Sequence, residues 1–281
     1  MSKIGTFLLG LGAAAVSVGS GLVVLSALGA PQAYLILNSV GLLGGGLLAA
    51  LLLMPASISP KALVLAALAS GGAVIATAFF GVSLEGVRRW IALGPVLLHV
   101  GVLALPFVMV AFARAPSRVT GLAVALILAG AALQPDAAIA SAVASGGLML
   151  AAIRPSSRFA WIIAALGIMS TGWSWLQPDA LPSVTFVEHV IPLAFAHGTG
   201  LGLVATLGLM TPALALFIFA RVDRRTSRTA MVLGAAWAGL AVAALVGNYP
   251  TPLVGYGFSP IVAYLLSWGL LALATDADMP R

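Results

Sequence analysis

The stretch IGTFLLGLGAAAVSVGSGLVVLSAL, residues 4–28, decides the fold, because no charged side chain occurs anywhere in it. A helix needs about 20 apolar residues to cross the hydrocarbon core of a bilayer. A signal peptide has a shorter apolar core and is followed by a soluble domain, and none follows here. The stretch is therefore expected to be the first membrane span.

Further apolar runs of similar length follow along the whole chain of 281 residues. The composition is 62% hydrophobic and 7% charged, against roughly 25% charged in a soluble domain. Only helices and closed barrels satisfy their backbone in lipid, so we predict an all-α membrane bundle of about ten transmembrane helices in one domain, 1–281. The predicted spans are approximately 4–28, 34–54, 61–82, 91–113, 118–134, 137–153, 158–176, 190–220, 228–247 and 253–275. The eighth is long enough to start with an interfacial or re-entrant piece around Pro192.

The cations between the spans predict the orientation. If both termini are cytoplasmic, all Lys and Arg except Arg88 and Arg89 fall in inner segments, as the positive-inside rule requires. The net charge of +6 is thereby explained by topology, and no nucleic-acid partner is expected. The chain has no cysteine, which excludes disulfides and cysteine-based metal sites.

The predicted membrane interior has no carboxylate; its titratable side chains are His99 and His197. Ion-coupled transporters usually carry an ionisable residue near the midplane, so this pattern disfavours an ion-driven pump. A histidine in such a helix is typically a hydrogen-bonding partner between helices.

Candidate chemistry gathers instead in four segments predicted to lie outside. RRWIALGP (88–95) places two arginines where they are costly, and guanidinium groups bind phosphate bidentately; pairing with lipid headgroups or Glu85 is the alternative. LQPD (133–136), repeated at 176–179, places a proline at a helix end and an aspartate that can cap the next helix. The loop from Trp173 to Val190 contains Glu188, a candidate general base. The glycine- and proline-rich segment 247–260, which includes PLVGYGFS (252–259), predicts irregular backbone beside a cavity.

In this order the four segments resemble the shape, elongation, division and sporulation (SEDS) family, also called the FtsW/RodA/SpoVE family. RRWIALGP is similar to the family's G-x-R-R-W-I-x-L-G-P, LQPD to its L-Q-P-D, and PLVGYGFS to its P-L-P-F-I-S-Y-G-G-S-S. The resemblance implies a glycosyltransferase that polymerises lipid-linked disaccharide (lipid II) outside the bacterial cytoplasmic membrane, in cell division or cell-shape control. It also implies a class B penicillin-binding protein or another envelope membrane protein as partner, and a divalent metal (Mg or Mn) as a candidate cofactor.

In this interpretation Glu188 is the catalytic base, and further residues bind the substrate. The candidate substrate-binding residues are Arg88, Arg89, Trp90, Gln134, Asp136, His189, Tyr256 and Ser259.

Two departures keep alternatives open. Val187 stands where the family has its catalytic aspartate, one residue before Glu188, and residues 99–102 read HVGV where the family continues to Q-P-S-E. The chain is therefore either an active polymerase with Arg88 and Arg89 on the diphosphate, a catalytically inactive scaffold or regulator of an envelope complex, or a flippase or transporter for an envelope lipid.

Overall fold

The computed structural model describes residues 1–54, 57–94, 96–177 and 181–273, which form eleven helices and three short strands. In chain order these are α1 (Lys3–Ala27), α2 (Gln32–Leu52), α3 (Pro60–Phe80), β1 (Val82–Leu84), β2 (Val87–Leu93), β3 (Val96–His99), α4 (Val100–Arg114), α5 (Arg118–Leu133), α6 (Ala137–Ile153), α7 (Arg158–Leu176), α8 (Val190–His197), α9 (Thr199–Val222), α10 (Ser227–Val246) and α11 (Phe258–Leu273).

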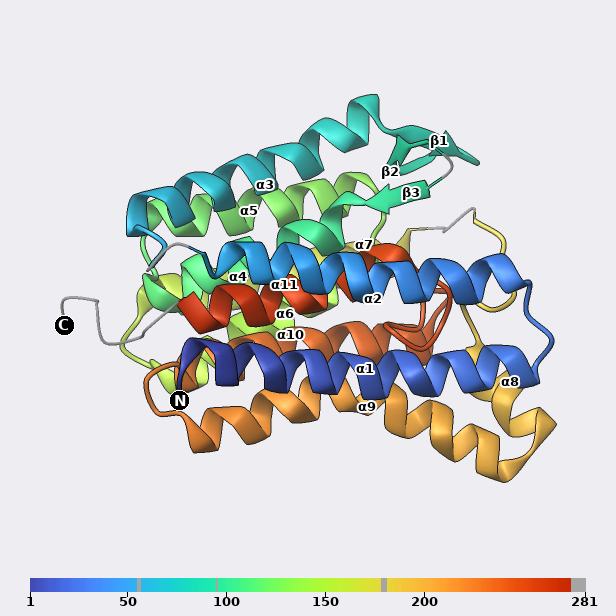
Figure 1. The fold of residues 1–281 in the computed structure, drawn as a ribbon. Coiled ribbons are helices and arrows are strands. Elements are labelled where there is room, and N and C mark those ends of the chain that lie inside the picture. The colour runs from blue at the N-terminus through green and yellow to red at the C-terminus, as the bar shows by residue number, and fades with distance from the viewer. Residues whose placement is uncertain (55–56, 95, 178–180, 274–281) are drawn as a thin grey trace.

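The long helices run back and forth between two ends of one bundle (Figure 1). The N-terminus and the end of α11 lie at the same end, which we call the N-terminal end. The strands and α8 lie at the opposite, far end. The helix ends that carry the cations predicted inside are at the N-terminal end, and Arg88 and Arg89 in β2 are at the far end. Arg281 lies outside the described residues.

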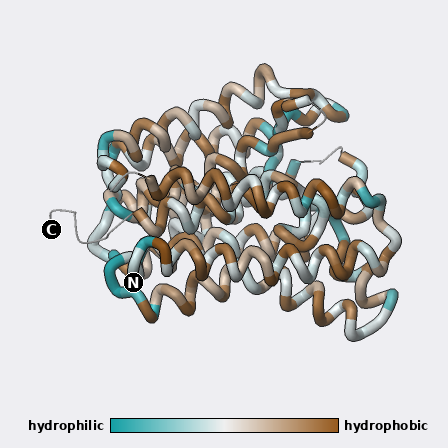
Figure 2. Tube along the Cα trace, viewed as in Figure 1, coloured by the Kyte–Doolittle hydropathy of each residue, from teal (hydrophilic) through white to brown (hydrophobic). Residues whose placement is uncertain are grey.

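Hydropathy confirms the predicted class, a polytopic membrane bundle. Six described helices, α1, α2, α3, α7, α9 and α10, are long and apolar enough to cross a membrane. The four shorter apolar helices are α4, α5, α6 and α11, and most residues of α4 and α11 are buried. A helix that is apolar all round and surrounded by other helices packs in a core rather than against lipid. Hydrophobic residues predominate along the length of the helices, and hydrophilic residues are concentrated towards the two ends of the bundle (Figure 2).

Short polar residues begin many of the helices, as capping chemistry predicts. Ser2, Ser59 and Ser157 each accept a hydrogen bond from a backbone N–H of the first turn that follows. Ser117 forms a capping box with Thr120. Asp136 caps α6 through Ile139 N–H at 3.2 Å, which confirms the predicted role of this aspartate in the turn. Part of the second LQPD copy, residues 178–180, lies outside the described residues.

The fourth predicted span, 91–113, is wrong at its start. Residues 91–93 and 96–99 belong to strands β2 and β3 of a three-stranded antiparallel sheet, and the helix begins only at Val100. In this sheet Trp90 pairs with His99 and Leu93 with Val96. Short apolar runs do not distinguish a strand from a buried helix, and here the left-handed Gly94 (φ 57°) allows the chain to reverse.

The eighth predicted span, 190–220, is confirmed to start with a separate piece. The short helix α8 ends at His197, Gly198 interrupts the helical backbone, and α9 continues to Val222. The segment therefore crosses the bundle once, with α8 packed against the outer part of α9.

Candidate functional site

A cavity of about 460 Å³ lies at the far end of the bundle, between the sheet, the turn from α5 to α6, the loop before α8 and the loop before α11. Most of its wall is apolar, including Leu37 of α2 and Leu97 of β3. Ligand sites typically combine such a wall with a few placed polar groups. The polar and charged side chains on this wall include Glu85, Arg89, His99, Asp136, Glu188, Asn248, Tyr249, Tyr256 and Ser259.

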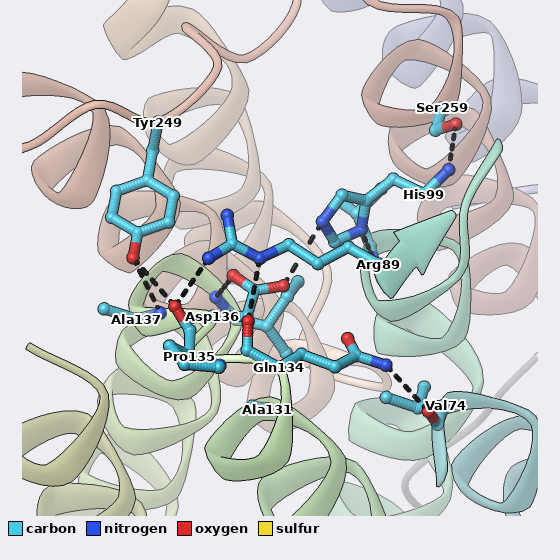
Figure 3. A network of polar contacts seen from close by, with 12 residues as sticks. Val74, Arg89, His99, Ala131, Gln134, Pro135, Asp136, Ala137, Tyr249 and Ser259 are labelled. Atoms are coloured by element: carbon cyan, nitrogen blue, oxygen red, sulfur yellow. Dashed lines mark hydrogen bonds and ion pairs between the residues drawn. The ribbon is translucent and has the colours of Figure 1, made fainter. Parts of the chain in front are cut away.

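Arg89 points from β2 onto the end of α5 (Figure 3). Its side chain is 3% exposed, and its Nε and Nη2 donate to the carbonyls of Gln134 and Pro135 at 3.0 and 2.7 Å. These carbonyls follow the C-terminus of α5, where unpaired carbonyls and the helix dipole favour a cation. The guanidinium also lies 5.6 Å from the centre of the Tyr249 ring. Arg89 therefore stabilises the α5–α6 turn as well as lining the cavity.

Asp136, in that turn, is 1% exposed and interacts with His99. His99 Nδ1 accepts from Val102 N–H at 3.3 Å, so its Nε2 carries the proton and faces Asp136 Oδ2 at 3.2 Å. Burial alone raises the pKa of the Asp136 carboxyl. The contact with His99, the Arg89 guanidinium and the Ile139 N–H outweigh burial, and the pKa of Asp136 lies below its ordinary value.

The loop before α11 is attached to the same cluster. The Tyr249 hydroxyl accepts from Ala137 N–H at 3.0 Å and donates to the Pro135 carbonyl at 3.3 Å. Ser259 Oγ accepts from the His99 backbone N–H at 2.9 Å. Three segments far apart in sequence, 89–99, 134–137 and 249–259, are thus joined in one polar network (Figure 3).

Glu188 lines the same cavity and lies on a tight turn between residues 184 and 189. Both Val187 N–H and Glu188 N–H donate to the Val184 carbonyl, and the Glu188 carboxylate accepts from Val184 N–H. Phe186 and His189 have positive φ values of 71° and 57°, an unusual backbone for residues with a side chain. Strained backbone of this kind is concentrated at functional sites.

The structure brings together six of the nine sequence-predicted site residues. Those that line the cavity are Arg89, Trp90, Asp136, Glu188, Tyr256 and Ser259. Successive side chains of a strand point to opposite faces, so Arg88 lies outside the cavity, exposed, and donates to the Phe79 carbonyl at 2.8 Å. Gln134 is buried and donates to the Val74 carbonyl at 2.9 Å. His189 is exposed, and its Nε2 lies 2.6 Å from Oδ1 of Asn248, on the rim of the cavity.

Sequence reasoning missed His99 and Tyr249 as cavity residues. His99 is a partner between segments, as expected for a histidine there, but its contact with Asp136 depends on a strand that was not predicted. Tyr249 lies in the segment 247–260, which was predicted to be irregular and beside a cavity, and its aromatic ring and hydroxyl could have marked it as a cavity residue.

The described side chains of the cavity do not form a suitable metal-binding site. Although Glu85, Asp136 and Glu188 line one cavity, no group of three or more His, Asp or Glu close enough to hold a metal occurs among the described residues. The divalent metal implied by the resemblance therefore takes no part in the chemistry proposed below.

These features define a multi-pass helical membrane protein with a cavity at one end of its bundle, walled mainly by apolar side chains and carrying a few charged ones. No protein-family model and no curated protein matches the sequence. Solved structures do match. The crystal structure of the rod shape determining protein RodA from Thermus thermophilus superposes with a TM-score of 0.63 at 24% identity, over 96% of this chain and 95% of that one.

Two further structures agree. An aspartate-to-alanine mutant of the same RodA gives a TM-score of 0.64 at 24% identity, over 96% of this chain and 95% of that one. A structure described as showing the coordination of polymerization and crosslinking by a peptidoglycan synthase complex gives 0.64 at 22% identity, over 96% of both chains. The chain therefore has the RodA fold over nearly its whole length, which confirms the resemblance at the level of fold.

Proposed function

We propose that this protein is a membrane glycosyltransferase that joins lipid-linked disaccharides (lipid II) into glycan strands at the outer face of the bacterial cytoplasmic membrane. The observation that carries the proposal is the presence of Glu188 and Arg89 on the wall of one cavity, at the end of the bundle predicted to face outwards. The apolar part of the wall suits the prenyl chain of such a substrate. The shared fold with a component of cell-shape machinery supports the same class.

The proposed chemistry uses this chain's own groups. The Glu188 carboxylate accepts the proton of the acceptor hydroxyl while that oxygen forms a bond to the donor sugar and the bond to the diphosphate breaks. The positive charge of Arg89 stabilises the negative charge that develops on the departing diphosphate. Arg88, outside the cavity, is not part of this step.

A catalytically inactive scaffold is the second candidate, and one observation favours it. Arg89, His99 and Asp136 already contact one another or nearby backbone, so this network is accounted for by structure alone. In either case a class B penicillin-binding protein is the proposed partner, since one structure with this fold belongs to a peptidoglycan synthase complex.

Purified full-length protein with labelled lipid II, Mg²⁺ or Mn²⁺, and with or without such a partner, tests the proposal. Glu188→Gln keeps the shape of the side chain but removes the base, and we expect polymer formation to fall by about 10²–10⁴-fold. Ser183→Ala, on the same exposed loop, is the matched control and should retain wild-type activity.

Three outcomes would count against the proposal. Polymer from Glu188→Gln at the wild-type rate would remove Glu188 as the base. Absence of polymer from the wild type under every partner condition would favour the scaffold. Movement of labelled lipid across liposomes without polymer would favour the flippase.

A further inference from the structure

The segment between α10 and α11 is irregular yet buried. Thr251, Pro252, Leu253, Val254 and Gly255 are all buried, and Leu253 has a positive φ of 62°. Buried backbone N–H and C=O groups require partners, and an irregular segment cannot find them in a helix or sheet. The positions of these partners determine where the segment lies.

Asn38 of α2 supplies two of these partners. Its Nδ2 donates to the Gly255 carbonyl at 3.0 Å, and its Oδ1 accepts from Gly257 N–H at 3.1 Å. The side chain is completely buried, in the second turn of a predicted span, where a polar amide is costly unless paired. The amide uses both a donor and an acceptor, which no apolar residue of similar size can replace.

Small residues bring α2 close enough for this contact. Gly41 and Gly45 lie on the same face of α2 as Asn38, three and seven residues further along. A Cβ at Gly45 would lie 3.0 Å from Val262 Cα, and one at Gly41 would lie 3.3 Å from the Phe258 ring. The approach of α2 to α11 thus depends on the absence of these side chains.

The other side of the segment binds the turn that carries Glu188. Thr251 N–H donates to the Val187 carbonyl at 2.9 Å, and Tyr256 N–H donates to the Phe186 carbonyl at 2.7 Å. A Cβ at Gly255 would lie 2.7 Å from the Val187 carbonyl oxygen. The residue before Glu188 is therefore held directly by the segment that Asn38 holds.

An aromatic stack reinforces the connection. The Tyr256 ring stacks on Tyr34 of α2 at 3.9 Å between centroids, and Phe186 meets Tyr34 edge-on at 6.4 Å. Tyr34 lies one helical turn from Asn38, so both contacts come from the same region of α2.

We propose that Asn38 is a positioning residue for Glu188. Through the 251–257 segment it sets where the Glu188 carboxylate lies on the cavity wall, although Asn38 itself does not line the cavity. This role rests on the proposed function in so far as Glu188 is the base. The placement of the turn can be measured independently of any activity.

The activity test compares Asn38→Leu and Asn38→Ser with Ser39→Ala. The Ser39 hydroxyl donates to the Leu35 carbonyl of its own helix, which makes it a matched control on α2. A base displaced by about 1 Å can cost about 100-fold in rate, so we expect kcat to fall by about that factor in the Asn38 variants. KM for lipid II should stay near the wild-type value, because the rest of the cavity wall is unchanged.

The structural test uses the absence of cysteine from the chain. Spin labels at Ser183→Cys and Leu133→Cys, both exposed at the far end, report the distance from the Glu188 turn to the end of α5. We expect a shifted or broadened distance distribution in both Asn38 variants and an unchanged one in Ser39→Ala. Asn38→Ser provides the measurement if Asn38→Leu does not fold.

An unchanged distance distribution in folded Asn38 variants would overturn the positioning role. A changed distribution in a protein whose wild type makes no polymer would instead support the positioning of the turn and reject the glycosyltransferase. A general loss of packing would raise KM and lower kcat together and would also contradict the proposal.

Discussion

Arg88 and Arg89 are adjacent in sequence, but the structure predicts very different consequences for their removal. Arg89 is 3% exposed and donates two hydrogen bonds to carbonyls at the end of α5. Hydrogen bonds from a charged donor contribute about 1.5–3 kcal/mol each, and a broken buried charged contact costs about 3–5 kcal/mol. We therefore expect Arg89→Ala to lower the free energy of unfolding by about 3–5 kcal/mol.

Arg88→Ala is the matched control. Arg88 is exposed and donates a hydrogen bond to the Phe79 carbonyl, so its loss should cost about 1 kcal/mol or less. Chemical unfolding in detergent, followed by tryptophan fluorescence, measures both variants. Because Trp90 lies beside both positions, a second probe such as helical circular dichroism should give the same midpoints.

Two results would contradict the roles assigned to Arg88 and Arg89. Equal destabilisation by the two variants, or a larger effect of Arg88→Ala, would refute the assignment of Arg89 to the end of α5. A small effect of Arg89→Ala on stability, combined with a large loss of lipid binding, would place Arg89 in the substrate site alone.

Three further outcomes are expected. The pKa of Asp136 is lower in the folded protein than in the unfolded chain, so its stabilising contribution is present above about pH 4 and is lost as the pH falls through the folded pKa. In Asp136→Asn the dependence of the melting temperature on pH, measured in detergent, should therefore flatten in this acid range. A profile like that of the wild type would contradict the contact with His99. Tyr249→Phe removes the hydroxyl that bonds Ala137 N–H and the Pro135 carbonyl, and should lower the free energy of unfolding by about 1–2 kcal/mol in the same assay. An unchanged free energy of unfolding would show that the network in Figure 3 is not formed. Gly45→Leu should destabilise the α2–α11 contact by about 1–3 kcal/mol. Gly44→Leu is the control and should be nearly neutral, because a Cβ at Gly44 would meet nothing within 4 Å. A larger destabilisation by Gly44→Leu than by Gly45→Leu would contradict the packing of α2.

The site could be predicted only in part, as Glu188 and the two neighbouring arginines illustrate. Its position after a loop, near the membrane surface, indicated a candidate base, and the structure places it on the cavity wall. The pairing of Arg88 with Arg89 on one ligand was expected from their adjacency. That expectation assumed a helical or loop end, whereas a strand turns neighbouring side chains to opposite faces.

The amino-acid sequence by itself determined the membrane class, the positions of most spans and the segregation of charge, because these depend on local composition over about 20 residues. It also determined the Asp136 cap, since a cap involves a residue and its next few neighbours. Tertiary structure alone decided the sheet at 82–99, the His99–Asp136 contact and the bonds from Asn38 to Gly255 and Gly257. The contacts of His99 and Asn38 join residues 37 to 219 positions apart, and no local pattern specifies which distant group a buried polar side chain will meet.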